Sequence, residues 1–179
     1  MNTYAIAPYV DDPVYGDKVK SLIQEGIESI AKAMNPDFTF TYSGFANSES
    51  TSQVICALCA CGVDPYTDPR FGDGKTNIVT QWVDKFAWAG GFKHVVSETQ
   101  PNSMATEQGC YALEWYLGFL ERGGAGKAYH MYYNRYNFAK TLSAEANILS
   151  FAIDGQNGEI TEGERSTIAV TVPDGMPLD

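Results

Sequence analysis

The chain has 179 residues, enough for one domain of ordinary size or for one domain and part of another. It carries 22 Asp and Glu residues against 12 Lys and Arg, a formal charge of −10 at pH 7 with no basic stripe, which repels phosphate backbones and excludes nucleic acid as an expected partner. No apolar run approaches the roughly 18 residues of a membrane span, and the N-terminus lacks a charged segment followed by an apolar one.

Two amphipathic helices are predicted in the first half of the chain, and a short helical fragment precedes them. The fragment covers about residues 2–7 and begins without any leading sequence, so we expect the chain to be a segment of a longer protein. Residues 19–34 and residues 76–89 each show apolar side chains at helical spacing with polar side chains between them. This pattern predicts helices with one face in water.

Two further segments, residues 54–61 and residues 109–120, are apolar almost all round. Only full burial suits such helices, so both are expected to form an inner layer behind the amphipathic helices. The order of the segments predicts a mainly α protein in which outer and inner helices alternate.

The two inner helices begin with a repeated sequence. Residues 47–58 match residues 102–113 at six positions, namely Asn, Ser, Thr, Gln, Ala and Leu. Farther upstream, residues 12–17 return as residues 68–73 with Asp, Pro, an aromatic residue, Gly and Asp in the same order. The repeated unit is therefore a whole helical hairpin.

The repeat predicts where the helical domain and its helices begin. We place the domain at residues 1–142, with units at about residues 12–67 and 68–122. In each unit the Asp-Pro pair, at Asp12 or Asp68, is expected to cap the outer helix, and an Asn-Ser pair is expected to cap the inner helix.

The pattern changes after Arg122, where a glycine-rich break and an aromatic tract over residues 129–138 follow. Residues 148–153 and 167–172 then alternate with a period of two and are predicted strands. We expect residues 147–179 to be the start of a β-sandwich-like module.

The repeated helix start, the Gly-Val-Asp-Pro loop that follows the first copy and a Gly-Gly-Phe turn resemble the prenyltransferase and squalene cyclase repeat superfamily. The residues that carry this resemblance are Asn47, Ser48, Thr51, Gln53, Ala57, Leu58, Gly62, Asp64, Pro65, Gly90, Gly91, Phe92, Asn102, Thr106, Gln108, Ala112 and Leu113. The resemblance covers roughly residues 1–122 and is strongest to versions in large surface proteins of Gram-positive bacteria. It implies a partial α/α toroid built of helical hairpins.

The tail adds a second resemblance. The sequences around Ile153-Asp154-Gly155 and over residues 168–175 resemble the opening of small immunoglobulin-like modules strung along such surface proteins. Together the two resemblances imply an extracellular or cell-wall location.

The catalytic motifs of this superfamily are missing from the sequence. Neither Asp-x-Asp-Asp nor Asp-Asp-x-x-Asp occurs, and no matching set of Asp, Cys and His zinc ligands is present. The leading hypothesis is therefore a non-catalytic surface-protein domain for ligand binding or spacing, without a cofactor. The alternative is a fragment of a terpenoid cyclase or prenyltransferase-like enzyme.

Two groups of residues have side chains of the kinds that bind metals. The three cysteines within residues 56–61 lie on one helix, and neither His94 nor His130 has a zinc-ligand spacing from them, so they are interpreted as core residues. The three aspartates within residues 64–73 do not match the spacing of a calcium loop, and the prolines among them favour simple turns. We expect no metal.

Six residues at the start of the inner helices are the candidates for ligand binding. They are Thr51, Gln53, Thr106, Gln108, Tyr111 and Trp115. The Thr and Gln residues occupy equivalent places in the two copies and could form the rim of a site for a glycan, lipid or peptide. The interpretation we favour for these four is hydrogen bonding between repeats, and core packing explains most of the aromatic residues.

Closure of the helical layers is the last expectation. Because a repeat buries its apolar face only against its neighbours, we expect the apolar side of residues 19–34 and the face at residues 55–58 to be poorly covered. Self-association, or cover by the β-tail, would then follow.

Overall fold

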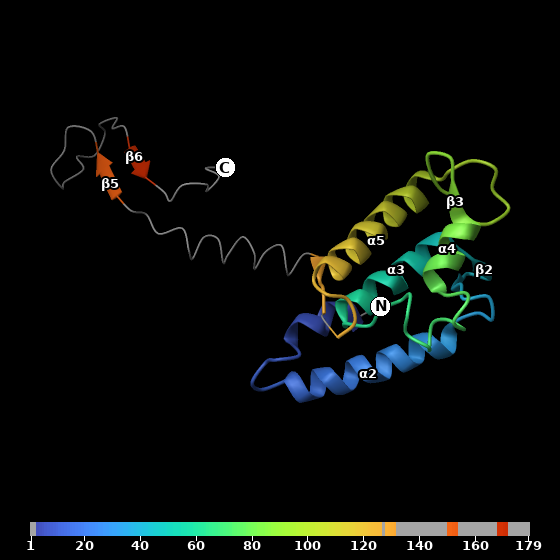
Figure 1. Ribbon diagram of the computed structural model, residues 1–179, viewed down its shortest axis with the longest axis horizontal. Coiled ribbons are helices and arrows are strands. Elements are labelled where there is room, and N and C mark those ends of the chain that lie inside the picture. Colours follow the sequence, from blue (N-terminus) through green and yellow to red (C-terminus); the bar gives the residue numbers. More distant parts are fainter. Residues whose placement is uncertain (1–2, 127, 132–149, 154–167, 172–179) are drawn as a thin grey trace. The chain divides into compact units, whose positions relative to one another are not determined.

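The computed structural model describes residues 3–126 and 128–131, together with the backbone of two strands near the C-terminus. The chain divides into two compact units, Met1–Tyr133 and Asn134–Asp179. The first unit is helical (Figure 1). The domain boundary predicted at residue 142 lies outside the described residues.

The described part of the second unit is one antiparallel hairpin. Its strands are β5 (Ser150–Ile153) and β6 (Ile168–Thr171), paired so that Ser150 lies opposite Thr171. Both strands lie within the segments that the period-two pattern predicts, so the position of these strands is confirmed.

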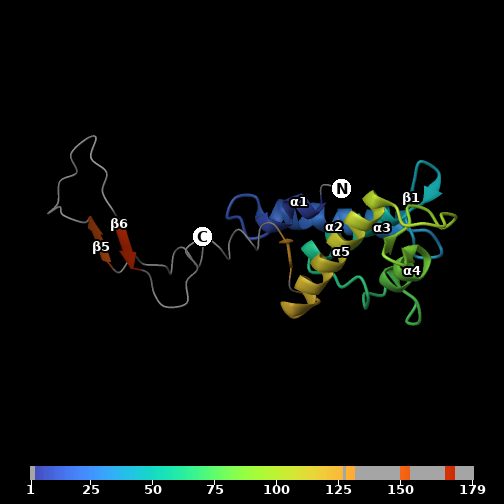
Figure 2. The ribbon, with the colours of Figure 1, turned by 90° about the horizontal axis from the view of Figure 1, so that it is seen from above.

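The first unit contains five α-helices within the described residues. They are α1 (Thr3–Ile6), which continues into the 3-10 turn η1 (Ala7–Tyr9), α2 (Gly16–Ala33), α3 (Ser48–Ala60), α4 (Ile78–Phe86) and α5 (Ser103–Glu121). The inner helices α3 and α5 pack against each other along their length, and the outer helices pack on inner ones, α2 on α1 and α4 on α3. Figures 1 and 2 show α3 at the centre of this arrangement. The mainly α architecture is confirmed.

A short antiparallel hairpin precedes each of the two long inner helices. Strands β1 (Thr41–Tyr42) and β2 (Phe45–Ala46) pair before α3, and β3 (Ala87–Trp88) and β4 (Gly91–Phe92) pair before α5. The second hairpin starts where α4 ends, so α4 is shorter than the predicted helix over residues 76–89.

Asparagine side chains begin the inner helices, as the repeat predicts. The Asn47 side chain accepts a hydrogen bond from the Ser50 amide, and the Asn102 side chain accepts from the amides of Met104 and Ala105. These bonds satisfy amides that have no partner within the helix.

The predicted aspartate caps of the outer helices are wrong. Asp12 accepts from the Val14 and Tyr15 amides in a turn before α2, and Asp68 accepts from Arg70 well before α4. Each aspartate stabilises a turn instead, because its side chain bonds amides two or three residues on.

The cap of α4 is a local pair that the repeat does not contain. Asn77 accepts from the Thr80 amide, and the Thr80 hydroxyl accepts from the Asn77 amide, which forms a reciprocal capping box.

The core lies between α3, α4 and α5. Trp82 of α4 is fully buried, stacks on Phe92 with ring centroids 4.6 Å apart, and donates its indole N–H to the Ser48 hydroxyl at 2.9 Å. Ile55 and Leu58 of α3 are 1% and 0% exposed. The expectation that this face of α3 would be poorly covered is therefore wrong.

The apolar side of α2 is covered as well, since Val19, Ile23 and Ile27 are buried.

The helix α5, in contrast, has one apolar side that is exposed. Leu113, Leu117 and Leu120 are 42%, 56% and 46% exposed, so the predicted full burial of this helix is wrong. One side of α5 packs on α3 and the other side is bare within the described residues.

Candidate functional site

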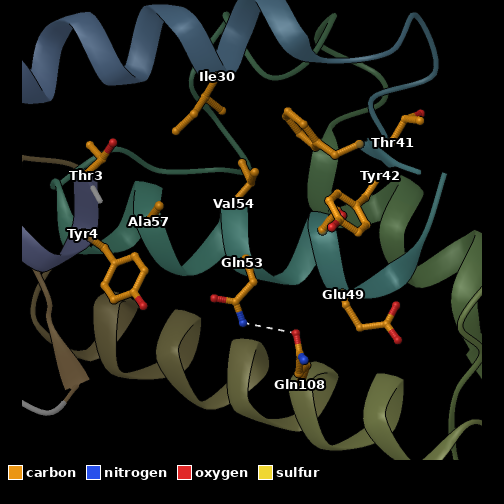
Figure 3. Close-up of a pocket in the computed structure, with 12 residues that line it drawn as sticks. Thr3, Tyr4, Ile30, Thr41, Tyr42, Glu49, Gln53, Val54, Ala57 and Gln108 are labelled. Carbon is orange, nitrogen blue, oxygen red and sulfur yellow. Dashed lines mark hydrogen bonds between the residues drawn. The ribbon is translucent and has the colours of Figure 1, made fainter. Parts of the chain in front are cut away.

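A cavity of about 440 Å³ lies between α1, α2, the β1 strand and α3, with α5 at its edge (Figure 3). Its lining residues are Thr3, Tyr4, Ile30, Phe40, Thr41, Tyr42, Glu49, Ser50, Gln53, Val54, Ala57 and Gln108. The cavity exists because α2 packs against α1 rather than closely against α3, which leaves a space above the middle of α3.

The walls of the cavity are apolar. Ile30 of α2 faces Val54 and Ala57 of α3, and the buried Phe40 also lines the cavity. Tyr42 stands at the mouth with most of its surface in water. A cavity of this size with apolar walls and a few polar groups has the general form of a small-molecule site.

One polar group at the edge is an amide pair that joins the two repeats. The Gln53 side-chain NH2 donates to the Gln108 side-chain oxygen at 3.2 Å. These two glutamines occupy the same position in the two copies of the repeat. The interpretation of both as residues that hydrogen-bond between repeats is confirmed. An amide has two donors and one acceptor, so this pair can still offer hydrogen bonds to a ligand.

The second polar group is Glu49, in the first turn of α3, where the helix favours negative charge. Both carboxylate oxygens lie 2.8–2.9 Å from Nδ1 of His94, and the His94 carbonyl accepts a hydrogen bond from the Ser48 amide. The backbone amide of His94 donates to the Glu98 carboxylate. These contacts fix the Glu49 carboxylate at the cavity mouth.

The two threonines of the predicted site have a structural part. The Phe40 amide donates to the Thr51 hydroxyl at 3.4 Å, and the Phe92 amide donates to the Thr106 hydroxyl at 2.9 Å. In both copies the same phenylalanine carbonyl accepts from the amide of the asparagine cap. These bonds lie within each repeat, so hydrogen bonding between repeats is the wrong interpretation for Thr51 and Thr106.

Tyr111 and Trp115 lie in an aromatic cluster beside the cavity. Trp115 is buried, contacts Tyr111 and His130 edge-on at 5.3 and 5.2 Å, and donates its indole N–H to the Tyr129 carbonyl. Tyr4 lies 6.0 Å from the Trp115 ring and also lines the cavity, so it connects the two regions. Burial lowers the pKa of His130.

The buried cysteines pack in the core as neutral thiols. Burial raises the pKa of Cys56 and of Cys61 to about 12, so both remain protonated at neutral pH. Among the described residues no group of three or more His, Cys, Asp and Glu side chains is placed to hold a metal ion.

The three aspartates of the loop between α3 and α4 accept hydrogen bonds within turns, as their sequence context predicts. Asp64 accepts from the Tyr66 amide, Asp68 from Arg70, and Asp73 from the amides of the two residues that follow Gly74.

The sequence alone missed most of the cavity, including Tyr4, Ile30, Phe40 and Glu49. These residues come from separate elements and share no periodic pattern. Glu49 did carry a signal, because the repeat has Met104 in the equivalent position. A charged residue that replaces an apolar one between otherwise matching copies indicates a local difference in environment.

Comparison of the chain with protein-family models, with curated proteins and with solved structures finds no match. Within the described part of the chain, no helix is both long enough and apolar enough to cross a membrane.

Proposed function

We propose that this chain is a non-catalytic binding domain that holds a small amphiphilic ligand in the cavity above α3. The observation that carries the proposal is the composition of that cavity, with apolar side chains on its walls and an amide pair and a carboxylate at its edge. Such a site encloses an apolar group and orients it through a few polar contacts.

The ligand class follows from the polar groups. The Glu49 carboxylate accepts hydrogen bonds and carries negative charge, and the net charge of the chain is −10. A ligand with an aromatic or branched apolar body and an amine end fits both features, because the apolar body displaces water from the walls while the amine pairs with the carboxylate. The N-terminus or a lysine of a peptide carries the same amine chemistry, so the natural ligand is proposed to be a peptide end or a small amine.

The wider setting is also a proposal. The starts of α3 and α5 share three features: an asparagine cap, a threonine hydroxyl that accepts from a phenylalanine amide, and a glutamine that bonds its counterpart. This repetition supports a partial α/α toroid. The β5–β6 hairpin near the C-terminus supports a following β-module. We place the domain on the bacterial cell surface, on the resemblance of both parts to surface proteins.

Tryptamine is the probe for the proposed site, and indole-3-propionate, which has the same ring and a negative end, is its matched control. We expect calorimetric titration to show tryptamine binding at least about tenfold more tightly than indole-3-propionate. Ala57→Leu should abolish binding, because the added atoms fill the cavity.

The carboxylate is tested with two variants that remove one negative charge each. Glu49→Gln should weaken tryptamine binding about tenfold, whereas Glu107→Gln, at an exposed position on α5, should leave it unchanged. Equal affinity of both probes would mean that the carboxylate does not select the amine, and equal loss in both variants would mean that the net charge of −10 explains the binding. Circular dichroism of each variant checks that the fold is intact.

A further inference from the structure

The exposed side of α5 carries an apolar stripe at coiled-coil spacing. Cys110, Leu113, Leu117 and Leu120 follow one another at intervals of three, four and three residues, and all four are exposed. This spacing forms the seam along which a second helix packs.

The internal repeat shows what covers the same side of α3. Ile55 and Leu58 are the equivalents of Cys110 and Leu113, and both are buried. Ser48, the equivalent of the exposed Ser103, accepts the indole hydrogen bond from Trp82 of α4. The α4 helix therefore lies over the face of α3 that is bare on α5.

Each described inner helix that precedes an outer helix packs against it, α1 against α2 and α3 against α4. The main described contacts of α5 are with α3 and with β4. A helix is thus the element whose shape matches the stripe.

Charge defines which helix fits. Glu107 and Glu121 are exposed and lie fourteen residues apart, or two heptads, so they form a row along one flank of the apolar stripe. Lysine or arginine on the facing flank of a partner complements this row. A second copy of this chain would bring the same acidic row and a further net charge of −10, which opposes self-association through α5.

We propose that the α5 stripe is the docking surface for an amphipathic helix of another protein, one with an apolar seam flanked by lysine or arginine. The leucines supply the affinity, because they lose contact with water on docking. The glutamates select the partner and speed its approach.

The test uses two labelled helical peptides of about 20 residues. Both have leucine along one seam, and the flanking positions are lysine in the first and glutamate in the second. We expect fluorescence anisotropy to show that the lysine peptide binds the full chain at least about tenfold more tightly than the glutamate peptide.

Two variants locate the binding. Leu117→Ser should weaken the lysine peptide about tenfold or more, whereas Leu22→Ser, which removes a similarly exposed leucine from α2, should leave its affinity unchanged. Neither variant alters charge. Binding of the lysine peptide should also protect Cys110 from maleimide.

Three outcomes would overturn the proposal. Equal binding to both variants would show attraction by net charge alone. A dimer of the chain that Leu117→Ser dissociates would assign the stripe to a second copy. A free monomer in which Cys110 does not react with maleimide would show that the chain itself covers the stripe.

Discussion

Leu58 and Leu113 form a matched pair for testing the fold, because they are equivalent in the repeat but differ in how deeply their side chains are buried. Leu58 is 0% exposed and Leu113 is 42% exposed. Truncation of a fully buried leucine to alanine loses about 0.8 kcal/mol for each of three carbon groups and leaves a cavity, which gives about 2–5 kcal/mol in total.

The cost at Leu113 should be much smaller. Part of that side chain already contacts water, and water fills the space left by truncation, so no cavity cost arises. Alanine also favours the helix slightly more than leucine does. We expect Leu113→Ala to destabilise the chain by about 1 kcal/mol or less, which leaves a difference of about 2 kcal/mol between the two variants.

Urea unfolding followed by circular dichroism measures both variants. The midpoint should fall clearly for Leu58→Ala and little for Leu113→Ala, with similar slopes for both. Equal losses in the two variants would refute the reasoning, since Leu113 would then have to be buried as deeply as Leu58.

Three further predictions concern the core, the thiols and pH. Gly109→Ala should destabilise the chain by about 1–3 kcal/mol in urea, because its new methyl group overlaps the ring of Phe92, which is stacked on a buried tryptophan; no loss would contradict this packing. Maleimide at neutral pH should label Cys110 and spare buried Cys56 until urea unfolds the chain, and early labelling of Cys56 or Cys59 would show the core to be open. Burial lowers the pKa of His130, so the unfolded chain binds this proton more readily and stability should fall as pH drops below about 6.5; His130→Gln should reduce that fall, and an unchanged pH profile would count against it.

Local signals in the sequence predicted the long helices and the two C-terminal strands, but not the short hairpins β1–β2 and β3–β4. The Asn47 and Asn102 caps depend on side chains that bond amides three residues on, so their sequence context is enough to identify them. The same applies to the C-terminal strands. The capping box of Asn77 and Thr80 is equally local. The Asp-Pro cap that the repeat predicts for α4 lies at Asp68, well before that helix begins.

Burial of the inner helices could be predicted only in part. The sequences around Leu58 and Leu113 match, yet Leu58 is fully buried and Leu113 is 42% exposed. An apolar composition predicts that a helix favours burial, but it does not predict which other element will pack on that helix.

The cavity could not be predicted from any single segment. Tyr4, Ile30 and Tyr42 come together only after α1, α2 and the β1 hairpin have packed around α3. Of the six predicted site residues, the two that line the cavity, Gln53 and Gln108, also bond to each other across the repeat. The repeat therefore indicated the edge of the site and not its walls.

The most direct test of the proposed site is to locate bound tryptamine by NMR. Intermolecular NOEs from the indole protons should reach the methyl groups of Ile30 and Val54, which face each other across the cavity. The methyl groups of Leu113 and Leu117 on α5 should show none. NOEs confined to α5, or their absence at Ile30 and Val54 under saturating tryptamine, would contradict a binding site above α3.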